Sequence, residues 1–524
     1  MNFIKSKQHM KELILFLLCL TVISGLKAQN GTRLIGFDAQ SMGRAGTSIG
    51  VFDSYGLMMT NPAGLSFLEK SSLNVDFSMM APKVHFKNTL NDVDGDKNLF
   101  PLPSLGYVNK SGNKDCKWTW GIGLFTQGGM GADFSLKNEL YRDQTYPQNT
   151  TNNTFYPVKG AYSTQSYHSK FAVMQFGPSF AYKMNDKFSV GASVYMVYST
   201  MEFRMPFGMN PVIMQGAPNG MTGMTFGQLF SMSPTQGGFG YNEVIASADM
   251  SKLNVISWGG KIGFAYKASD KLSFGLNYTL PTKLAYKSGK ATMDMSKQFE
   301  DAMGRAVMGL YQNPAMKGVP LNTAMGYISA NFAQMGIDLS KGVAAEYGLD
   351  VTMKLPMSIG YGMSYQASSK FKLALDLEWM NWADAFDKMQ IKMTNGTNAN
   401  INKMIGSNAI NMDFPLKWKN TVIVKVGGEY NFTNQFTMRL GYAYGSNPVP
   451  NTTIFPAFPA VVENHLTLGG SYKISKRVML STAIESALNK KETASNPSEI
   501  QSEFSGSTSE LGTFLGHISL TWNL

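Results

Sequence analysis

Hydrophobic and polar residues alternate along most of this chain, in segments separated by turns or by longer irregular stretches. Over residues 73–79, for example, every second residue is apolar and the residues between them are Asn, Asp and Ser. A period of two with one apolar face predicts a β-strand that lies between two different environments. The pattern recurs, weakly at 102–108 and clearly at 118–124, 188–196, 272–280, 357–365, 371–379, 422–430, 436–444, 466–474, 478–484 and 518–524.

The two faces of these strands favour a membrane over a soluble sandwich. The polar face is dominated by Gly, Ser, Thr and Asn and also carries charges, among them Lys261, Asp376 and Glu378. The apolar face carries large aromatic residues near the strand ends, such as Trp258 and Tyr266. Aromatic belts at both ends of strands of about 10 residues are typical of transmembrane β-barrels. We therefore predict a membrane barrel whose apolar face meets lipid.

Short and long connections alternate between the predicted strands. Short turns fall near 109–115, 185–186, 268–270, 367–369, 431–434 and 475–476, and long loops near 81–100, 127–170, 200–251, 286–353, 381–416, 447–463 and 488–510. Six short turns alternating with seven long loops require 14 strands. Short turns face the periplasm and long loops face outside in such barrels. The sequence thus predicts an all-β fold, a transmembrane 14-stranded antiparallel β-barrel over residues 72–524.

The segment that precedes the barrel, residues 29–71, is rich in glycine and other small residues. It has too little apolar surface to form its own core, so we expect an N-terminal hatch that plugs the lumen. Asn61-Pro62 predicts a fixed turn, because proline pins its own φ and biases the preceding residue away from helix. We expect the glycine-rich part before this turn to rearrange easily, and Arg44 and Asp53 to link the hatch to charges in the lumen.

Two of the long loops carry features of a ligand-binding surface. In the loop 286–353, two apolar stripes repeat at helical spacing, namely Phe299, Met303 and Val307, and then Met325, Ile328 and Phe332. The loop 200–251 is dense in methionine, a flexible side chain that adapts to ligands of variable shape. One interpretation is that the helices pack on each other as a lid. The other is that these six residues line an extracellular groove for a hydrophobic ligand.

Residues 1–28 have the order of a secretory signal peptide: lysines, the apolar run 13–23, and small residues before a predicted cleavage site after Ala28. The rest of the chain holds only Cys116, so we expect no intramolecular disulfide. Charged residues make up 15% of the chain, below the ~25% usual in soluble domains, and this fits a membrane protein. The net charge of +11 is scattered, so nucleic acid is not expected as a partner.

No motif for catalysis, for a metal or for a cofactor stands out. The five histidines lack metal-ligand spacing, and there is no nucleophile elbow, P-loop or dinucleotide fingerprint. Asp376 and Glu378 share one strand face and could in principle form the carboxylate pair of a hydrolase. Charges that line a polar lumen are the ordinary interpretation, so we expect neither an enzyme nor a cofactor.

At several places the sequence resembles the FadL-type long-chain fatty acid transporters of bacterial outer membranes. The most specific matches are Gln40 to Ala45 and the signature Asn61-Pro62-Ala63-Gly64, which look like the hatch of that family. Further matches are 258–281, 379–386 and 441–450. The resemblance implies a 14-stranded barrel with a hatch and diffusive uptake of hydrophobic molecules. Capture would occur outside, followed by passage to an internal pocket and exit through a side opening.

From this resemblance we expect an outer-membrane protein that takes up hydrophobic compounds, above all long-chain fatty acids. The alternatives are another apolar ligand, such as an aromatic hydrocarbon or haem, a general porin, or a surface receptor. A porin needs an open aqueous lumen, which the predicted hatch would close. The expected partners are a fatty acid-like molecule, outer-membrane lipid and, because the last strand 518–524 ends in apolar residues, the barrel assembly machinery.

Overall fold

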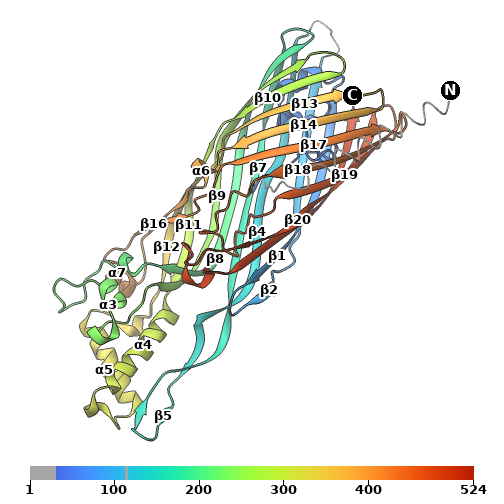
Figure 1. Cartoon of the computed structure of the whole chain (residues 1–524). Helices are drawn as coiled ribbons and strands as arrows, with labels where there is room; N and C mark the ends of the chain where they lie inside the picture. Colours follow the sequence, from blue (N-terminus) through green and yellow to red (C-terminus); the bar gives the residue numbers. More distant parts are fainter. Residues whose placement is uncertain (1–30, 112–115) are drawn as a thin grey trace.

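The computed structural model of the protein describes residues 31–111 and 116–524, which form a closed antiparallel barrel (Figure 1). The barrel has 14 strands, each paired with the next. They are β1 (Ser72–Lys87), β3 (Phe100–Lys110), β4 (Trp118–Thr145), β7 (Val158–Lys183), β8 (Phe188–Met209), β9 (Val244–Lys267), β10 (Leu272–Thr279), β13 (Ser358–Gln366), β14 (Phe371–Met380), β17 (Thr421–Asn431), β18 (Phe436–Gly445), β19 (Asn464–Lys473), β20 (Val478–Thr493) and β21 (Thr508–Asn523). β1 closes the barrel against β21. The predicted fold and strand number are confirmed, whereas the predicted signal peptide lies outside the described residues.

The barrel continues well beyond the length that a membrane requires. β4 and β7 are 28 and 26 residues long, against about 9–11 for a membrane-spanning strand. Five further strands bring the sheet to 19: β2 (Asp92–Asp94), β11 (Thr282–Asp294), β12 (Ala344–Leu355), β15 (Lys388–Thr394) and β16 (Ile410–Pro415). The prediction that 127–170 is a loop is therefore wrong, because most of this segment is strand, as are the ends of the predicted loops 200–251 and 286–353. A small hairpin, β5 (Gln148–Asn149) with β6 (Thr154–Phe155), lies near the tip of this extension.

Near the short turns, apolar side chains face outward and polar side chains face the lumen. On β1, Leu73 and Val75 are exposed, whereas Asn74 and Asp76 are buried. Lipid offers no partner for polar groups, so the outer face must be apolar while the inner face can carry hydrogen-bonding groups. The predicted orientation of the two faces is confirmed.

Farther toward the long loops, the chemistry of the two faces reverses while the alternation continues. On β8, Ser193 faces the lumen near the short turns, but Met201 and Phe203 do so farther along the same strand. The outward residues between and after them are Glu202 and Arg204. Once the strand has left the hydrocarbon region its outer face contacts water, where polar and charged side chains are favoured. The extension is therefore an apolar-lined tube, and the largest hydrophobic core of the described residues runs through it into the helices at its end.

Helices cap the long-loop end of the barrel, as Figure 1 shows. They are α3 (Phe226–Ser231), α4 (Ser296–Tyr311), α5 (Leu321–Gln334) and α7 (Ala399–Ile405), and α4 and α5 carry the two predicted apolar stripes. Two shorter helices lie elsewhere, α2 (Ala39–Met42) within the lumen and α6 (Trp382–Ala385) after β14. In the part of the chain that the structure describes, no helix is both long and apolar enough to cross a membrane.

The orientation of the faces predicts how a charge on the lipid side is tolerated. Leu276 on β10 is 44% exposed on the outer face, so Leu276→Arg should cost roughly 2–4 kcal/mol near the bilayer midplane and lower the folding yield. Ser166→Arg, at an exposed position of β7 beyond the apolar band, should fold normally. Heat-modifiable gel migration after refolding into lipid vesicles measures both yields. Equal yields for the two variants would contradict the assignment of the lipid-facing surface.

Candidate functional site

Residues 31–71, called the hatch below, fill the lumen near the short turns and lie directly against glycines of the wall. A Cβ at Gly275 would lie 1.8 Å from the Ile49 carbonyl oxygen, and one at Gly441 would lie 2.4 Å from the Ala45 nitrogen. Only glycine permits backbone contact at such distances. Nine strands contribute to this glycine ring: Gly106, Gly121, Gly191, Gly263, Gly275, Gly362, Gly427, Gly441 and Gly469.

The predicted motif at Asn61 joins the hatch to two neighbouring strands. Asn61 Nδ2 donates to the carbonyl oxygen of Ile49 within the hatch at 2.8 Å and to that of Phe264 on β9 at 2.9 Å. Ser189 Oγ on β8 donates to the Ala63 carbonyl oxygen at 2.6 Å. Because Asn61 is fully buried, its amide serves the hatch and the wall at once.

The remaining motif residues shape the turn beside this junction. Pro62 begins the short helix η2 (Pro62–Phe67), and the Gly64 nitrogen donates to the Asn61 carbonyl oxygen at 3.0 Å. On the next strand, Asn277 Nδ2 donates to the Thr60 carbonyl oxygen at 2.5 Å. Asn277 is an inward polar position that alternation alone would mark as tolerant of substitution, but it is part of the seat of the hatch.

Arg44 and Asp53 lie in one network of charges between the hatch and the wall. Arg44 is fully buried and donates to Asp53 at 2.9 and 3.0 Å and to Glu429 on β17 at 2.6 Å. Lys372 lies 3.3 Å from both carboxylates, and Arg439 Nε lies 2.7 Å from Glu429. Although burial opposes ionisation, Arg44 and Lys372 hold the pKa of Asp53 below its ordinary value. Removing one partner would leave a buried charge unpaired, so the network holds the hatch in place.

The glycine-rich part of the hatch is bound to the wall as closely as the Asn61 turn. Asp376 Oδ2 on β14 accepts hydrogen bonds from the Ser48 and Ile49 nitrogens at 2.8 and 3.0 Å. Lys425 Nζ on β17 donates to the Ile35 carbonyl oxygen at 2.9 Å. Flexible residues alone therefore do not make this segment loose, because their small size is what allows the close contacts.

A group of charged side chains lies at the edge of the hatch that faces the apolar extension. Arg33 Nη1 lies 2.5 Å from Glu378 Oε1, and Lys425 Nζ lies 3.7 Å from Glu378 Oε2. Lys261 on β9 is 3% exposed and interacts electrostatically with all three of these groups. Among the described residues, no carboxylate lies within ion-pair distance of Lys261. We call Arg33, Lys261, Lys425 and Glu378 the charged floor.

This arrangement bears on the possible chemistry of the carboxylates. Asp376 is bonded to the hatch backbone and Glu378 is bonded to Arg33, so neither is free to act on a substrate. Over residues 31–111 and 116–524, no group of three or more His, Cys, Asp or Glu residues is placed to hold a metal ion. The arrangement suits structural ion pairing rather than acid–base chemistry.

Two small apolar cavities follow each other along the extension, an inner one nearer the hatch and an outer one nearer the helices. The inner chamber is lined mainly by Phe171, Met201, Phe203, Met353, Met389, Phe414, Leu416, Phe455 and Phe458, and the outer chamber by Phe207, Met209, Ala246, Ala248, Met250, Ala291, Met293, Ile391, Met393 and Met412. Their volumes are about 40 and 30 Å³, room for a water molecule but not for a fatty acid or an aromatic ring. Passage of a ligand thus requires the methionines and phenylalanines to change rotamer.

Aromatic side chains connect these chambers and close them. Phe414 on β16 packs against Phe203 and Phe207 of β8, with ring centroids 6.1 and 5.5 Å apart. Phe455, on the segment between β18 and β19 that folds into the tube, lies 5.4 Å from Phe414. Phe504, between β20 and β21, packs on Phe455 at 6.3 Å. Two inward-folded connections therefore block the tube above the hatch.

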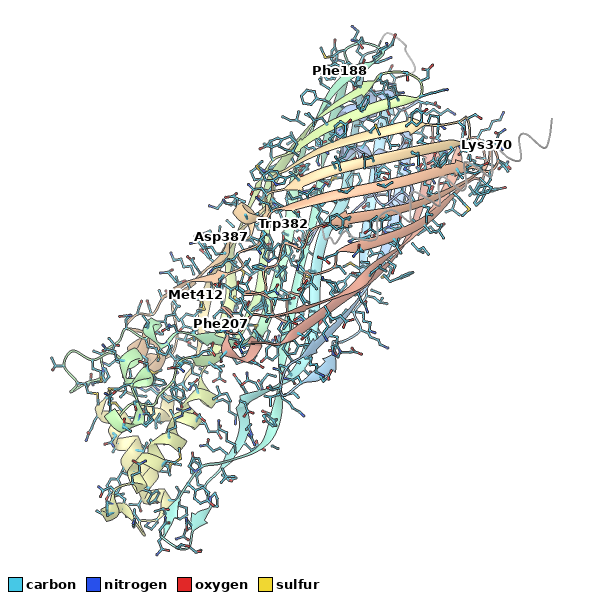
Figure 2. All side chains as sticks on the ribbon, in the orientation of Figure 1. Phe188, Phe207, Lys370, Trp382, Asp387 and Met412 are labelled. Atoms are coloured by element: carbon cyan, nitrogen blue, oxygen red, sulfur yellow. The ribbon has the colours of Figure 1, made fainter. Side chains whose placement is uncertain are left out.

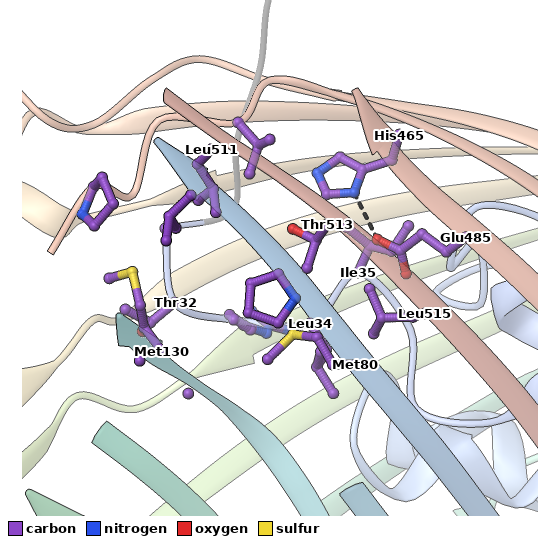
Figure 3. A pocket seen from close by; sticks show the side chains of 18 residues that line it. Thr32, Leu34, Ile35, Met80, Met130, His465, Glu485, Leu511, Thr513 and Leu515 are labelled. Atoms are coloured by element: carbon purple, nitrogen blue, oxygen red, sulfur yellow. Dashed lines mark hydrogen bonds and ion pairs between the residues drawn. The ribbon is translucent and has the colours of Figure 1, made fainter. Parts of the chain in front are cut away.

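A side pocket of about 80 Å³ lies between the start of the hatch and the wall (Figure 3). Thr32, Leu34 and Ile35 line it from the hatch, facing Met80 of β1 and residues of β21. The neighbouring strands pair incompletely here. β3 pairs with β1 up to Phe100 but with β4 only up to Leu105, opposite Leu124, and β4 has a bulge just beyond, at residues 126–128. From this point toward the long loops, strand pairing no longer holds β3 against β4, so the wall between them can rearrange.

The six predicted groove residues divide between two environments. A cleft of about 580 Å³ in the helical cap, the cap cleft, is lined by Ile328 and Phe332 of α5, together with residues of α4 and of the segment 219–239. Phe299 and Val307 are buried, and Phe299 packs on Phe332 with ring centroids 5.9 Å apart. The remaining two, Met303 and Met325, are partly buried against the same core. Only two of the six therefore face the cleft, and the others pack the helices together.

Sequence reasoning did not find the residues that line the two chambers. They lie where alternation continues but apolar residues have moved to the inner face, as at Met201 and Phe203. The aromatic group Trp382, Phe386 and Trp418 was also missed. The ring centroids of Phe386 and Trp418 are 4.6 Å apart, and both rings pack on Phe458 of the inner chamber. The sequence did contain a signal, namely which of the two alternating faces of a strand carries the apolar residues. In β8 the apolar residues move from the outward to the inward face beyond residue 199.

These features define a class of protein, an outer-membrane β-barrel whose lumen is filled by a hatch and continues outward as an apolar tube. The chain matches the family described as outer membrane protein transport protein (OMPP1/FadL/TodX) over residues 20–517, and it belongs to this family. The predicted resemblance and the predicted location in the outer membrane are thereby confirmed.

Solved structures share the fold. The Pseudomonas putida toluene transporter TodX aligns with a TM-score of 0.65 at 18% identity, covering 95% of this chain and 100% of that one. A Pseudomonas aeruginosa FadL homologue aligns with a TM-score of 0.63 at 17% identity, covering 94% and 100%. The Ralstonia pickettii toluene transporter TbuX aligns with a TM-score of 0.61 at 18% identity, covering 94% and 99%. Among curated proteins, no relative matches the chain by sequence.

The glycine ring predicts that one added side chain unseats the hatch. Gly441→Val would place carbon atoms inside the contact with Ala45, at an overpacking cost of roughly 1–3 kcal/mol. We expect the variant barrel to fold but its hatch to become accessible from the periplasmic end, seen as cleavage of residues 31–71 by a protease added to the protein in detergent. Gly516→Val is the matched control, because a Cβ there meets nothing within 4 Å. A Gly441→Val hatch as resistant to the protease as the Gly516→Val hatch would show that the glycine contact does not hold it.

Proposed function

We propose that this protein carries hydrophobic compounds across the outer membrane by diffusion, with long-chain fatty acids as the principal class. The observation that supports this proposal most is the reversal of the inner face, which lines the extension with apolar side chains from the cap to the hatch. Such a lining binds apolar molecules by removing their surface from water, at roughly 25 cal/mol per Å² buried. An aqueous porin would need a polar lumen instead.

The charged floor favours an anionic head at the inner end of the ligand. Arg33, Lys261 and Lys425 share the single nearby partner Glu378, while Asp376 is engaged by the hatch backbone. Lys261 therefore offers a buried amine donor at the hatch end of the apolar tube, with no carboxylate within ion-pair distance among the described residues. A fatty acid can place its chain in the tube and its carboxylate at Lys261, where a charge-assisted hydrogen bond in a dry site is strong.

Entry and exit follow from the cavities. The cap cleft is the largest opening near the extracellular end, and its mixture of Ile328, Phe332 and Arg305 suits first capture of an amphiphile. The hatch closes the path to the periplasm, so we propose that the ligand leaves sideways into the membrane between β3 and β4. The short β3–β4 ladder and the side pocket beside it support this exit.

A second candidate function is uptake of neutral aromatic hydrocarbons. The outer chamber is lined almost wholly by Met, Ala, Ile and Phe side chains, so it offers nothing that a carboxylate needs. Two proteins of the same fold, TodX and TbuX, are toluene transporters. The two candidates differ in whether Lys261 takes part in binding.

The substitution Lys261→Met separates these candidates. If a carboxylate binds at the charged floor, the variant should bind a long-chain fatty acid about tenfold to a hundredfold more weakly, because a hydrogen bond to a charged group contributes ~1.5–3 kcal/mol. Binding of the methyl ester of the same acid should not change. Tryptophan fluorescence titration in detergent measures both, with Lys187→Met in an exposed periplasmic turn as the control.

Each outcome of this titration points to one candidate. Equal affinity of wild type and Lys261→Met for the acid, with tight binding of toluene, would favour the neutral hydrocarbon. Loss of affinity for the acid and the ester alike would indicate damage to the tube rather than loss of a charge.

A further inference from the structure

A polar hollow lies on the outer surface of the extension, away from the lumen and from the path of the ligand. It measures about 460 Å³ and lies over β11, β12, β15 and β16. Its polar lining consists of Lys287, Asp350, Thr352, Gln390, Lys392, Asn411 and Asp413. In Figure 2, Asp387 and Met412 label this flank of the molecule, between the membrane part of the barrel and the helical cap.

The strand register arranges these side chains in rows across the sheet. Asp350 on β12 is opposite Lys392 on β15, which is in turn opposite Asn411 on β16. The next row on the same face holds Thr352, Gln390 and Asp413. Residues two apart on a strand share a face, so the rows form one continuous polar surface. Lys287 on β11 extends the first row, with Nζ 2.8 Å from Asp350.

A row of lysines borders this surface on the side nearer the membrane. Lys283 on β11 lies directly opposite Lys354 on β12, and both are exposed. Along the chain, the lipid-facing Leu280 lies three residues before Lys283 and the lipid-facing Ile359 lies five residues after Lys354, with 43% and 44% exposure. Lys283 is three residues beyond Leu280, roughly 10 Å along the strand. The row therefore lies at the level where headgroups of the outer leaflet begin.

The charges of the patch are only partly compensated by the protein itself. Lys354 and Lys388 pair with Asp384 and Asp413 at 3.1 and 2.6 Å. Lys283 and Lys392, by contrast, have no carboxylate within ion-pair distance among the described residues. Lys283 lies opposite Lys354, a like charge that Asp384 compensates, so Lys283 and Lys392 are the two lysines of the patch whose charges an external anion would balance.

We propose that this surface binds the phosphorylated sugar headgroup of a glycolipid in the outer leaflet. The free lysines Lys283 and Lys392 contact phosphate, a group that lysine binds as a point charge. The amides and carboxylates between them, Gln390, Asn411 and Asp413, supply the donors and acceptors that sugar hydroxyl groups need. Acyl chains of the same lipid would lie along the apolar band below the lysine row. This site is independent of the proposed uptake of fatty acids.

The experiment measures binding of a bis-phosphorylated, acylated glucosamine disaccharide to the full-length protein in mild detergent, by native mass spectrometry. The double variant Lys283→Gln/Lys392→Gln should bind roughly thirtyfold more weakly, since each lysine near an anionic lipid surface contributes a factor of about five. Lys83→Gln/Lys491→Gln is the matched control. It removes the same charge from exposed positions of β1 and β20. Heat-modifiable migration verifies that both variants are folded.

Two further arms identify the source of the phosphate and test the proposal. The dephosphorylated form of the same lipid should bind weakly to wild type, and millimolar inorganic phosphate should not displace the phosphorylated lipid. Equal affinities of the two double variants would overturn the proposal, because the patch would then contribute nothing specific. Equal binding of the phosphorylated and dephosphorylated lipids would overturn it as well, and displacement by free phosphate would show that the lipid is not the ligand.

Discussion

The structure depends on a reversal of inner-face chemistry along its strands. Where the outer surface meets lipid, hydrogen-bonding groups must turn inward, and this gives the lumen the polar lining that receives the hatch. Where the outer surface meets water, the constraint is lifted and apolar residues occupy the inner face, as at Met201 and Phe203 of β8. The lumen of one barrel is therefore polar near the short turns, where it holds the hatch, and apolar toward the long loops. The charged floor of Arg33, Lys261, Lys425 and Glu378 marks the junction between them.

The hatch is stable because the wall makes room for its backbone. Glycines of nine strands lie against it, and polar wall side chains such as Asn277, Asp376 and Glu429 satisfy its buried acceptors, donors and charges. Such contacts replace the apolar core that a segment of this composition cannot form. Because the hatch is held on all sides, the exit that we propose for an apolar ligand runs sideways through the wall. The incomplete pairing of β3 with β4 lies where this route would begin.

How far the sequence predicted this structure depended on the environment of each strand. In the membrane, lipid imposes a strict alternation, so strands such as 73–79 and the short turns that lie wholly in the described residues were predicted correctly, and the count of 14 followed. Beyond the membrane, both faces of β4 and β7 mix polar and apolar residues, and their long continuation was read as a loop. Alternation alone also could not show that Asn277 contacts the hatch, because that contact joins residues 217 positions apart.

The candidate site shows the same division. Residues that carry a local sequence signal were predicted to lie in the lumen, namely the turn at Asn61 and the charges Arg44 and Asp53. In the structure they form hydrogen bonds or ion pairs there. The chambers could not be predicted, because Phe203, Phe414 and Phe455 come from three distant segments that only the closed barrel brings together. Helical spacing in α4 and α5 predicted the helices, yet it could not separate residues that face the cap cleft from those that pack the helices.

The most direct test is a crystal structure of the protein with a long-chain fatty acid that carries bromine at its methyl end. We predict anomalous density for bromine within the tube, between the inner and outer chambers, with the carboxylate near Lys261 and the hatch in its present position. Bromine found only on the lipid-facing surface, or in a lumen from which the hatch has moved, would contradict it.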